Sequence, residues 1–118
     1  ALTELVDLYP TFAELAGLED EVPESVQGRS LVPLLRDPSG QRWQSKPAYS
    51  VMGSKRSVQR SIRTERYRYS RYTTDEEELY DHDNDPEEFT NQASNPEYAS
   101  TLRSLRTKMD EIKVRANP

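Results

Sequence analysis

Residues 61–72 read SIRTERYRYSRY, and this short stretch decides the fold that the sequence predicts. Residues of opposite polarity alternate with a period of two on both sides of Glu65 and Arg66, which is the pattern of half-buried strands. We therefore predict a β-hairpin with strands at 57–64 and 67–72 and a tight turn between them. The tyrosines of the second strand repeat at the sheet period, so they are expected to be core or cross-strand partners rather than platforms for stacked bases.

Two more short strands are predicted beside this hairpin. Residues 47–52 (PAYSVM) precede it, with a loop at 53–56, and residues 78–81 (ELYD) follow an acidic loop. Short sequential strands joined by tight turns indicate an antiparallel meander.

The beginning of the chain has a helical period instead. Its apolar residues recur three and four apart, at Leu5, Leu8, Tyr9, Phe12, Leu15 and Ala16. Pro10 leaves two alternatives, a kinked helix from Thr3 or a regular helix capped by Asp7 with Pro10 in its first turn, and we favour the second. Gly17 is expected to end this helix.

Two other helices complete the prediction. Ser30 is expected to cap a short helix with Pro33 in its first turn, and residues 37–40 (DPSG) form a turn cluster where we place a boundary. Asn95-Pro96-Glu97 is a strong helix start. The apolar stripe that follows, predicted to cover one face of the sheet, consists of Tyr98, Leu102, Leu105, Met109 and Ile112. The predicted fold class is α+β, a small antiparallel sheet of about four strands packed by a C-terminal helix and preceded by two helical segments.

The composition excludes several classes of function. The net charge of −5 and the pI near 4.9 argue against a general nucleic-acid binder, and no apolar run is long enough for a membrane helix. The chain contains no cysteine, which removes disulfides, thiolate metal sites and cysteine nucleophiles. Because the first residue is not Met and the chain opens directly in a helical pattern, we expect it to be part of a longer protein.

The basic residues concentrate in the predicted hairpin. Seven of the sixteen lie between Lys55 and Arg71, with Glu65 as the one acid among them. An anion site is one interpretation, because arginine forks match sulfate, carboxylate and phosphate. A solvated sheet face, or a face packed on an acidic partner, is the other.

The acidic residues concentrate between Asp75 and Glu88, and part of this segment imitates a calcium loop. Residues 81–85 (DHDND) resemble the start of an EF-hand, but the sixth position is Pro86 instead of glycine and the twelfth is Gln92 instead of a bidentate acid. We therefore interpret the segment as a turn in which Asp and Asn side chains cap the backbone. No self-sufficient active site is predicted. We expect no catalytic residue and no metal ligand in this chain.

Five segments in order resemble the C-terminal part of a type I sulfatase of the alkaline phosphatase superfamily. They are LTELVDLYPTFAELAGL, GRSLVPLLRDP, KPAYS, SIRTERYRYSRY and ELYDHDNDPEEFTN. KPAYS together with SIRT and YRYS is similar to the iduronate-2-sulfatase-like branch. The resemblance covers nearly the whole chain and implies that residues 1–36 are terminal helices of the catalytic domain and that residues 37–118 are the C-terminal subdomain.

The resemblance also implies what the chain lacks. Type I sulfatases hydrolyse sulfate esters with a formylglycine, made from Cys or Ser in a Cys/Ser-x-Pro-x-Arg motif, beside a calcium ion. Neither the motif nor the metal ligands are present, so the chain alone is expected to be inactive and its parent protein to use both groups. A periplasmic, secreted or lysosome-like compartment is expected for that parent.

The family architecture gives the arginines a specific hypothesis. The C-terminal sheet packs on the catalytic domain and helps to shape the pocket for a sulfated carbohydrate, so Arg60, Arg63 and Arg68 are the substrate-binding candidates. An ion pair of Arg63 with the catalytic domain is the structural alternative. We also predict that the first helix exposes an apolar face, which would favour homo-oligomers of the isolated chain. Nucleic acid and membrane are not expected as partners.

Two other functions stay open at this point. The chain could be a standalone anion-binding or interaction module. It could also be the same subdomain of a related phosphatase or phosphonate hydrolase, in which case the sequence upstream would differ.

Overall fold

The computed structural model describes residues 1–40, 43–54 and 57–116, with side chains through residue 112. The chain divides into two compact units, Ala1–Lys46 (the first unit) and Pro47–Pro118 (the second unit). This division falls after the turn cluster at 37–40 where the sequence placed a boundary. The assignment of 1–36 and 37–118 to different domains of a parent protein stays a prediction.

The first unit is helical, and Pro10 lies in the first turn of its main helix. A single turn of 3₁₀ helix, η1 (Leu5–Asp7), leads directly into α1 (Leu8–Leu15), so the helix does not start at Thr3. Gly17 follows with φ of 70°, and its N–H donates to the carbonyl of Glu14, as expected for a residue that ends a helix in the left-handed conformation. The short helices η2 (Glu19–Glu21) and α2 (Val32–Arg36) complete the unit.

A close crossing fixes the segment before α2 against η1. A Cβ atom on Gly28 would lie 2.0 Å from the carbonyl oxygen of Val6, so only glycine fits there. Beside the crossing, the buried carboxylate of Asp7 accepts the N–H of Arg29 at 3.0 Å. The role predicted for Asp7 as a helix cap is therefore modified, since its side chain bonds to the neighbouring segment instead of to α1.

Ser30 acts at the start of α2 as predicted, although the helix begins one residue later than a Ser30 cap implies. Its Oγ accepts the N–H of Val32 at 3.1 Å, while Leu31 occupies the cap position. The N–H of Leu31 donates in turn to the hydroxyl of Thr11 in α1.

The second unit contains the antiparallel meander that the sequence predicts. Its strands are β1 (Ala48–Ser54), β2 (Ser57–Arg63), β3 (Tyr67–Tyr72) and β4 (Glu77–Asp81), in the sheet order β1-β2-β3-β4. The tight turn at Glu65 and Arg66 is closed by the N–H of Thr64, which donates to the carbonyl of Tyr67 at 2.8 Å. The predicted loop at 53–56 is wrong for Gly53 and Ser54, which extend β1; Lys55 and Arg56 lie outside the described residues.

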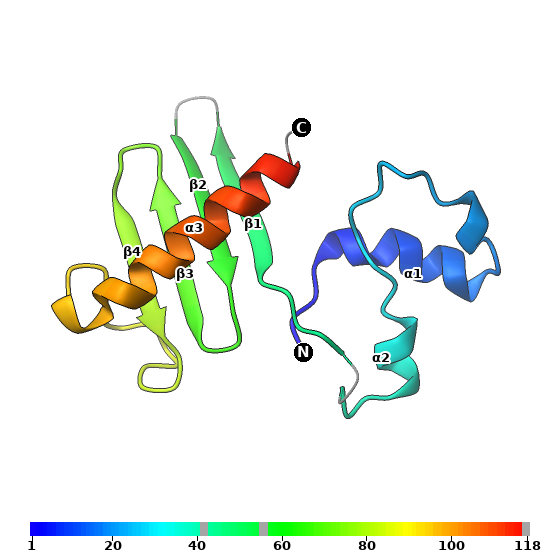
Figure 1. Ribbon diagram of the computed structural model, residues 1–118, viewed down its shortest axis with the longest axis horizontal. Helices are drawn as coiled ribbons and strands as arrows, with labels where there is room; N and C mark the ends of the chain where they lie inside the picture. The colour runs from blue at the N-terminus through cyan, green and yellow to red at the C-terminus, as the bar shows by residue number, and fades with distance from the viewer. Residues whose placement is uncertain (41–42, 55–56, 117–118) are drawn as a thin grey trace. The chain divides into compact units, whose positions relative to one another are not determined.

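The last helix covers one face of this sheet (Figure 1). Asn95 caps a turn of 3₁₀ helix, η3 (Pro96–Tyr98), by accepting the N–H of Glu97 at 3.0 Å, and α3 (Ala99–Ala116) continues from it. The core between the two layers consists of Ile62, Tyr69, Leu79, Leu102, Leu105 and Met109. The α+β class and the helical stripe are thereby confirmed.

The outer edge of β4 is closed by the segment that leads to α3. Asn91 accepts the N–H of Leu79 at 3.0 Å and donates to the carbonyl of Glu77 at 3.0 Å, and the N–H of Gln92 donates to the carbonyl of Leu79. Such pairing removes an unprotected edge that could otherwise bind another chain. Among the described residues, no helix combines the length and the apolar character needed to cross a membrane.

Candidate functional site

The strand register separates the candidate arginines onto two faces of the sheet. Arg63 pairs with Arg68, whereas Arg60 pairs with Arg71. Because side chains alternate along a strand, Arg60 shares the face of Ile62, which α3 covers. The opposite face, which we call the arginine face, is formed by Gln59, Ser61, Arg63, Arg68, Ser70, Tyr72, Glu78 and Tyr80. The structure thus brings Arg63 and Arg68 together and leaves Arg60 apart from them.

Arg63 and Arg68 form a pair of like charges directly opposite each other, an arrangement that costs free energy without a compensating anion. Glu88 supplies one by forming an ion pair with Arg68. Arg63 donates from Nη1 to the carbonyl of Thr64 at 2.7 Å. Burial lowers the pKa of the Arg63 guanidinium, Glu88 opposes this shift and Arg68 adds to it. Within the described part of the chain, Arg63 therefore has no carboxylate bonded to it.

Glu88 also connects the chain's single histidine to this cluster. His82 Nε2 lies 2.5 Å from Oε1 of Glu88, and the guanidinium of Arg68 lies 5.6 Å from the centroid of the Tyr80 ring. Glu88 has a φ of 61°, which is unusual for a residue with a side chain. Sequence reasoning missed both Glu88 and His82, because their contacts depend on how the turn after β4 folds back.

The rest of the arginine face is a hydrogen-bonded polar surface. Gln59 donates to the Tyr72 hydroxyl at 2.9 Å, and that hydroxyl donates to Glu78 at 3.2 Å. Burial and the neighbouring carboxylate of Glu78 raise the pKa of Tyr72. Ser70 donates to Ser61 across the strands at 3.1 Å. Guanidinium and hydroxyl groups of this kind can bind sulfate, carboxylate or sugar hydroxyls.

The buried carboxylate of Asp81 stabilises the fold and is not part of the arginine face. Asp81, buried at the end of β4, accepts both Nε and Nη2 of Arg66 at 2.7 Å, the hydroxyl of Tyr98 at 2.9 Å and the amide of Asn84 at 2.8 Å. These donors, Arg66 first, hold the pKa of Asp81 well below its usual range. Asp81 is the first position of the EF-hand imitation, and its oxygens already face protein donors.

Glu77 performs a similar function between the sheet and α3. Arg106 binds both of its carboxylate oxygens, and Tyr69 donates to one of them. The Arg106 guanidinium holds the pKa of Glu77 below its ordinary value. Burial is the first cause of a raised pKa at the Tyr69 hydroxyl, followed by the bond to Glu77.

The described residues do not offer a metal site. No group of three or more His, Cys, Asp or Glu side chains in that part of the chain is arranged to hold a metal ion. The sequence contains no Cys/Ser-x-Pro-x-Arg motif in which a residue could be converted to formylglycine. The residues present therefore do not fit either group.

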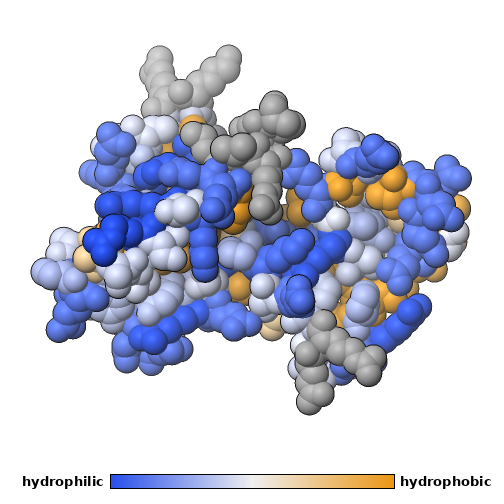
Figure 2. All heavy atoms as spheres, viewed as in Figure 1, coloured by the Kyte–Doolittle hydropathy of each residue, from blue (hydrophilic) through white to orange (hydrophobic). Residues whose placement is uncertain are grey.

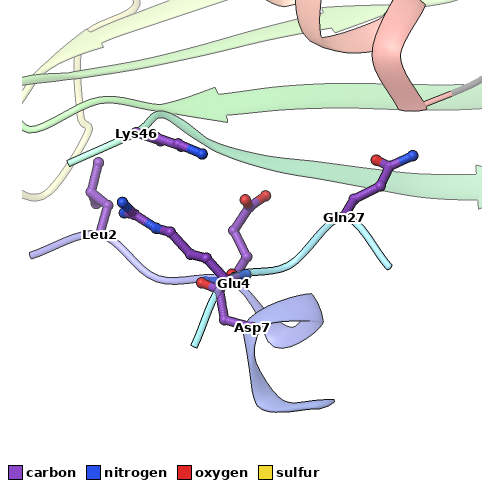
Figure 3. A pocket seen from close by; sticks show the side chains of 6 residues that line it. Leu2, Glu4, Asp7, Gln27 and Lys46 are labelled. Atoms are coloured by element: carbon purple, nitrogen blue, oxygen red, sulfur yellow. The ribbon is translucent and has the colours of Figure 1, made fainter. Parts of the chain in front are cut away.

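A small polar hollow in the first unit is structural as well. It has a volume of about 30 Å³, room for one water, and Figure 3 shows Glu4, Asp7, Gln27 and Lys46 around it. The carboxylate of Asp7 is already bonded there to the backbone N–H groups of Glu4 and Arg29.

The exposed apolar face of α1 is confirmed. Phe12 is 63% and Leu15 60% exposed on α1, and Leu5, which the sequence analysis placed on the same face, lies in η1 and is 86% exposed. Figure 2 shows hydrophobic atoms at the surface over the first unit. Monomeric proteins seldom expose a contiguous apolar surface without a partner for it.

The sequence of this chain is similar to a known protein family and to known proteins. Residues 1–115 match the family described as N-sulphoglucosamine sulphohydrolase, C-terminal. A Δ4,5-hexuronate-2-O-sulfatase of Bacteroides thetaiotaomicron is 33% identical over 120 residues, covering 94% of this chain and 24% of that protein. A multifunctional alkaline phosphatase superfamily protein of Trinickia caryophylli is 30% identical over 121 residues, covering 90% and 23% respectively.

A solved structure gives the same result. The structure of a protein in complex with its substrate D-glucosamine-2-N,6-O-disulfate matches with a TM-score of 0.80 and 30% identity, covering 93% of this chain and 24% of the other. The chain spans between 20% and 24% of the length of the first relatives that it matches. The chain therefore belongs to the N-sulphoglucosamine sulphohydrolase C-terminal family, the C-terminal region of sulfatases of the alkaline phosphatase superfamily.

Proposed function

We propose that the chain is the C-terminal subdomain of a sulfatase of the iduronate-2-sulfatase-like branch, which hydrolyses sulfate esters of a carbohydrate. The observation that carries this proposal is the family match over residues 1–115, together with a relative named as a hexuronate-2-O-sulfatase. Because the chain spans about a quarter of such proteins, the remaining residues of the parent supply the reaction. Calcium and formylglycine belong to that part of the parent, and its compartment is periplasmic, secreted or lysosome-like.

The arginine face is the part of this subdomain that we assign to the substrate pocket. Arg63 and Arg68 lie side by side on it, and one carboxylate, Glu88, is paired with Arg68. A second carboxylate on this face, Glu78, accepts the hydroxyl of Tyr72, so the guanidinium of Arg63 is the group left to bind a sulfate or a carboxylate of the sugar. Arg60 lies on the face that α3 covers, so its role in substrate binding has less support from the geometry.

The exposed face of α1 supports packing on the catalytic domain. Its large apolar side chains have little contact in the described residues, and the family architecture supplies a domain to cover them. The same face would drive association of the isolated chain, which light scattering at increasing protein concentration measures directly. A monomer at the highest concentration would contradict this expectation.

The substrate role of the arginine face is tested by charge reversal in the full-length parent. Arg63→Glu should raise KM for the sulfated sugar while the protein remains soluble and folded. The matched control is Arg60→Glu, the same change in the same strand on the opposite face. A folded Arg63→Glu enzyme with an unchanged KM would refute substrate contact, and loss of soluble protein would indicate an assembly role.

A second candidate function is the same subdomain in a phosphatase or phosphonate hydrolase. The similarity to the multifunctional alkaline phosphatase superfamily protein favours it, since sequence identity there is close to that of the sulfatase. Assays of the parent on matched sulfate, phosphate and phosphonate esters decide between the two.

A further inference from the structure

A groove lies on the opposite side of the second unit from the arginine face, between α3 and the β2–β3 turn. It has a volume of about 360 Å³, within the range of roughly 300–1,000 Å³ typical of small-molecule sites. Thr64 and Tyr67 line it from the turn, and Ser100, Ser104 and Lys108 line it from α3. The helical residues are four apart, so they form one stripe along the groove.

The donors along this stripe are available. The three polar side chains of the stripe are exposed, and within the described part of the chain they make no hydrogen bond or ion pair; they are Ser100, Ser104 and Lys108. Leu105, which is buried, and Tyr67 also line the groove and form its apolar part. The Tyr67 ring is held by an edge-on contact with Tyr98.

We propose that this groove binds one anionic saccharide unit, at a site separate from the substrate pocket. The serine hydroxyls match sugar hydroxyls as donors and acceptors, and the Lys108 ammonium matches a single sulfate or carboxylate. The apolar part accommodates the C–H face of a sugar ring. One cation among neutral hydroxyls suits a singly substituted sugar better than a phosphopeptide or a polyanion such as nucleic acid. The inference does not rest on a substrate role for Arg63.

The test is an NMR titration of the whole 118-residue chain with three probes: a monosulfated disaccharide that contains a uronic acid, its desulfated counterpart and sodium sulfate. Amide shifts are expected at residues 64–67 and 100–108 with a disaccharide, and much smaller shifts with sodium sulfate at the same concentration. Comparison of the two disaccharides shows whether sulfate or carboxylate is the anion. Equal shifts with sodium sulfate alone would overturn the saccharide assignment.

Three variants complete the test. Lys108→Ala should weaken the affinity about fivefold by removing one charge-assisted contact. Ser104→Leu should abolish binding by filling the groove without changing charge, and leucine is a good helix former at this position. Arg103→Ala is the matched control, because it removes the same charge from α3 at a position that does not line the groove. The proposal fails if Lys108→Ala leaves the affinity unchanged, or if Arg103→Ala weakens it equally.

Discussion

Replacing Asp81 by Asn tests how the second unit is held together. The carboxylate is 1% exposed and accepts donors from a turn, a helix and a loop. Arg66 donates Nε to one oxygen and Nη2 to the other, both at 2.7 Å. In the Asp81→Asn variant one of the two oxygens is replaced by an amide NH₂ group. In either orientation this NH₂ group would face an N–H donor of Arg66, so two donors would meet. Asn cannot reproduce the site in either orientation.

The expected loss of stability is about 3 kcal/mol. Losing hydrogen bonds to a charged group costs about 1.5–3 kcal/mol. The upper end applies because the Asp81 carboxylate is buried and accepts several donors, whereas the Arg66 left behind is 44% exposed, regains water and remains 3.2 Å from Asp83. For a unit of this size, the loss corresponds to a fall in melting temperature of about 15 °C.

The pH dependence of this loss has a definite sign. The pKa of Asp81 in the folded chain is held below its ordinary value of 3.8. Its contribution is therefore complete above pH ~5 and is lost as the pH falls below about 4. Since Asn does not titrate, the stability difference between the two proteins should be full at pH 7 and shrink at pH 3. Glu77 titrates in both proteins and cancels from the difference.

Urea unfolding followed by circular dichroism at 222 nm measures this difference through α3. The control is Asp83→Asn, which makes the same charge change at a side chain that is 64% exposed and should cost little. The reasoning is refuted if Asp81→Asn costs less than about 1 kcal/mol, or if the difference is the same at pH 7 and pH 3.

Three other predictions concern different parts of the fold. Gly28→Ala should destabilise the first unit by about 3 kcal/mol because its Cβ would overlap the carbonyl of Val6, and fluorescence of the chain's single tryptophan in that unit measures it. Arg106→Ala should lower the free energy of unfolding by about 1–2 kcal/mol at pH 7. The loss should be smaller below pH 4, because the pKa of Glu77 is lowered in the folded chain and the carboxylate charge that Arg106 stabilises is lost on acidification. A double-mutant cycle with Glu77→Gln measures the coupling of the pair. Asn91→Ala should speed amide exchange at Leu79 by opening the edge of β4, whereas Asn91→Asp, which keeps the acceptor, should change it less.

The hairpin could be predicted from the sequence because local alternation and turn length determine it. The bounds of β3 and the turn at Glu65 and Arg66 are as predicted, and β4 begins only one residue early. The last helix was also predictable, because Asn95 and Pro96 mark its start and its apolar stripe has helical spacing. The extension of β1 through Gly53 was not, since glycine in a strand has the same local signal as glycine in a loop.

Contacts between distant segments were the part that local patterns could not supply. The need for glycine at position 28 comes from the backbone of Val6, and the edge protection of β4 comes from Asn91. One such contact has a local signal that the sequence analysis did not use. Asp81 has the same parity along β4 as the buried Leu79, so its carboxylate points toward the core, and a buried carboxylate requires a cation or several donors.

The same parity argument explains which arginines reach the candidate site. Ile62 and Tyr69 point toward α3, so residues an even number of positions from each share their face along β2 and β3. Arg60 belongs to that set, and Arg63 and Arg68 do not. The division of the basic cluster into two faces is thus a consequence of strand period and core position, both readable from the sequence. The net charge of the arginine face cannot be read from the sequence, because Glu88 reaches Arg68 only when the turn after β4 folds back. The number of cations left for a substrate therefore depends on a contact of that turn, and Glu88 is the residue whose replacement would change it.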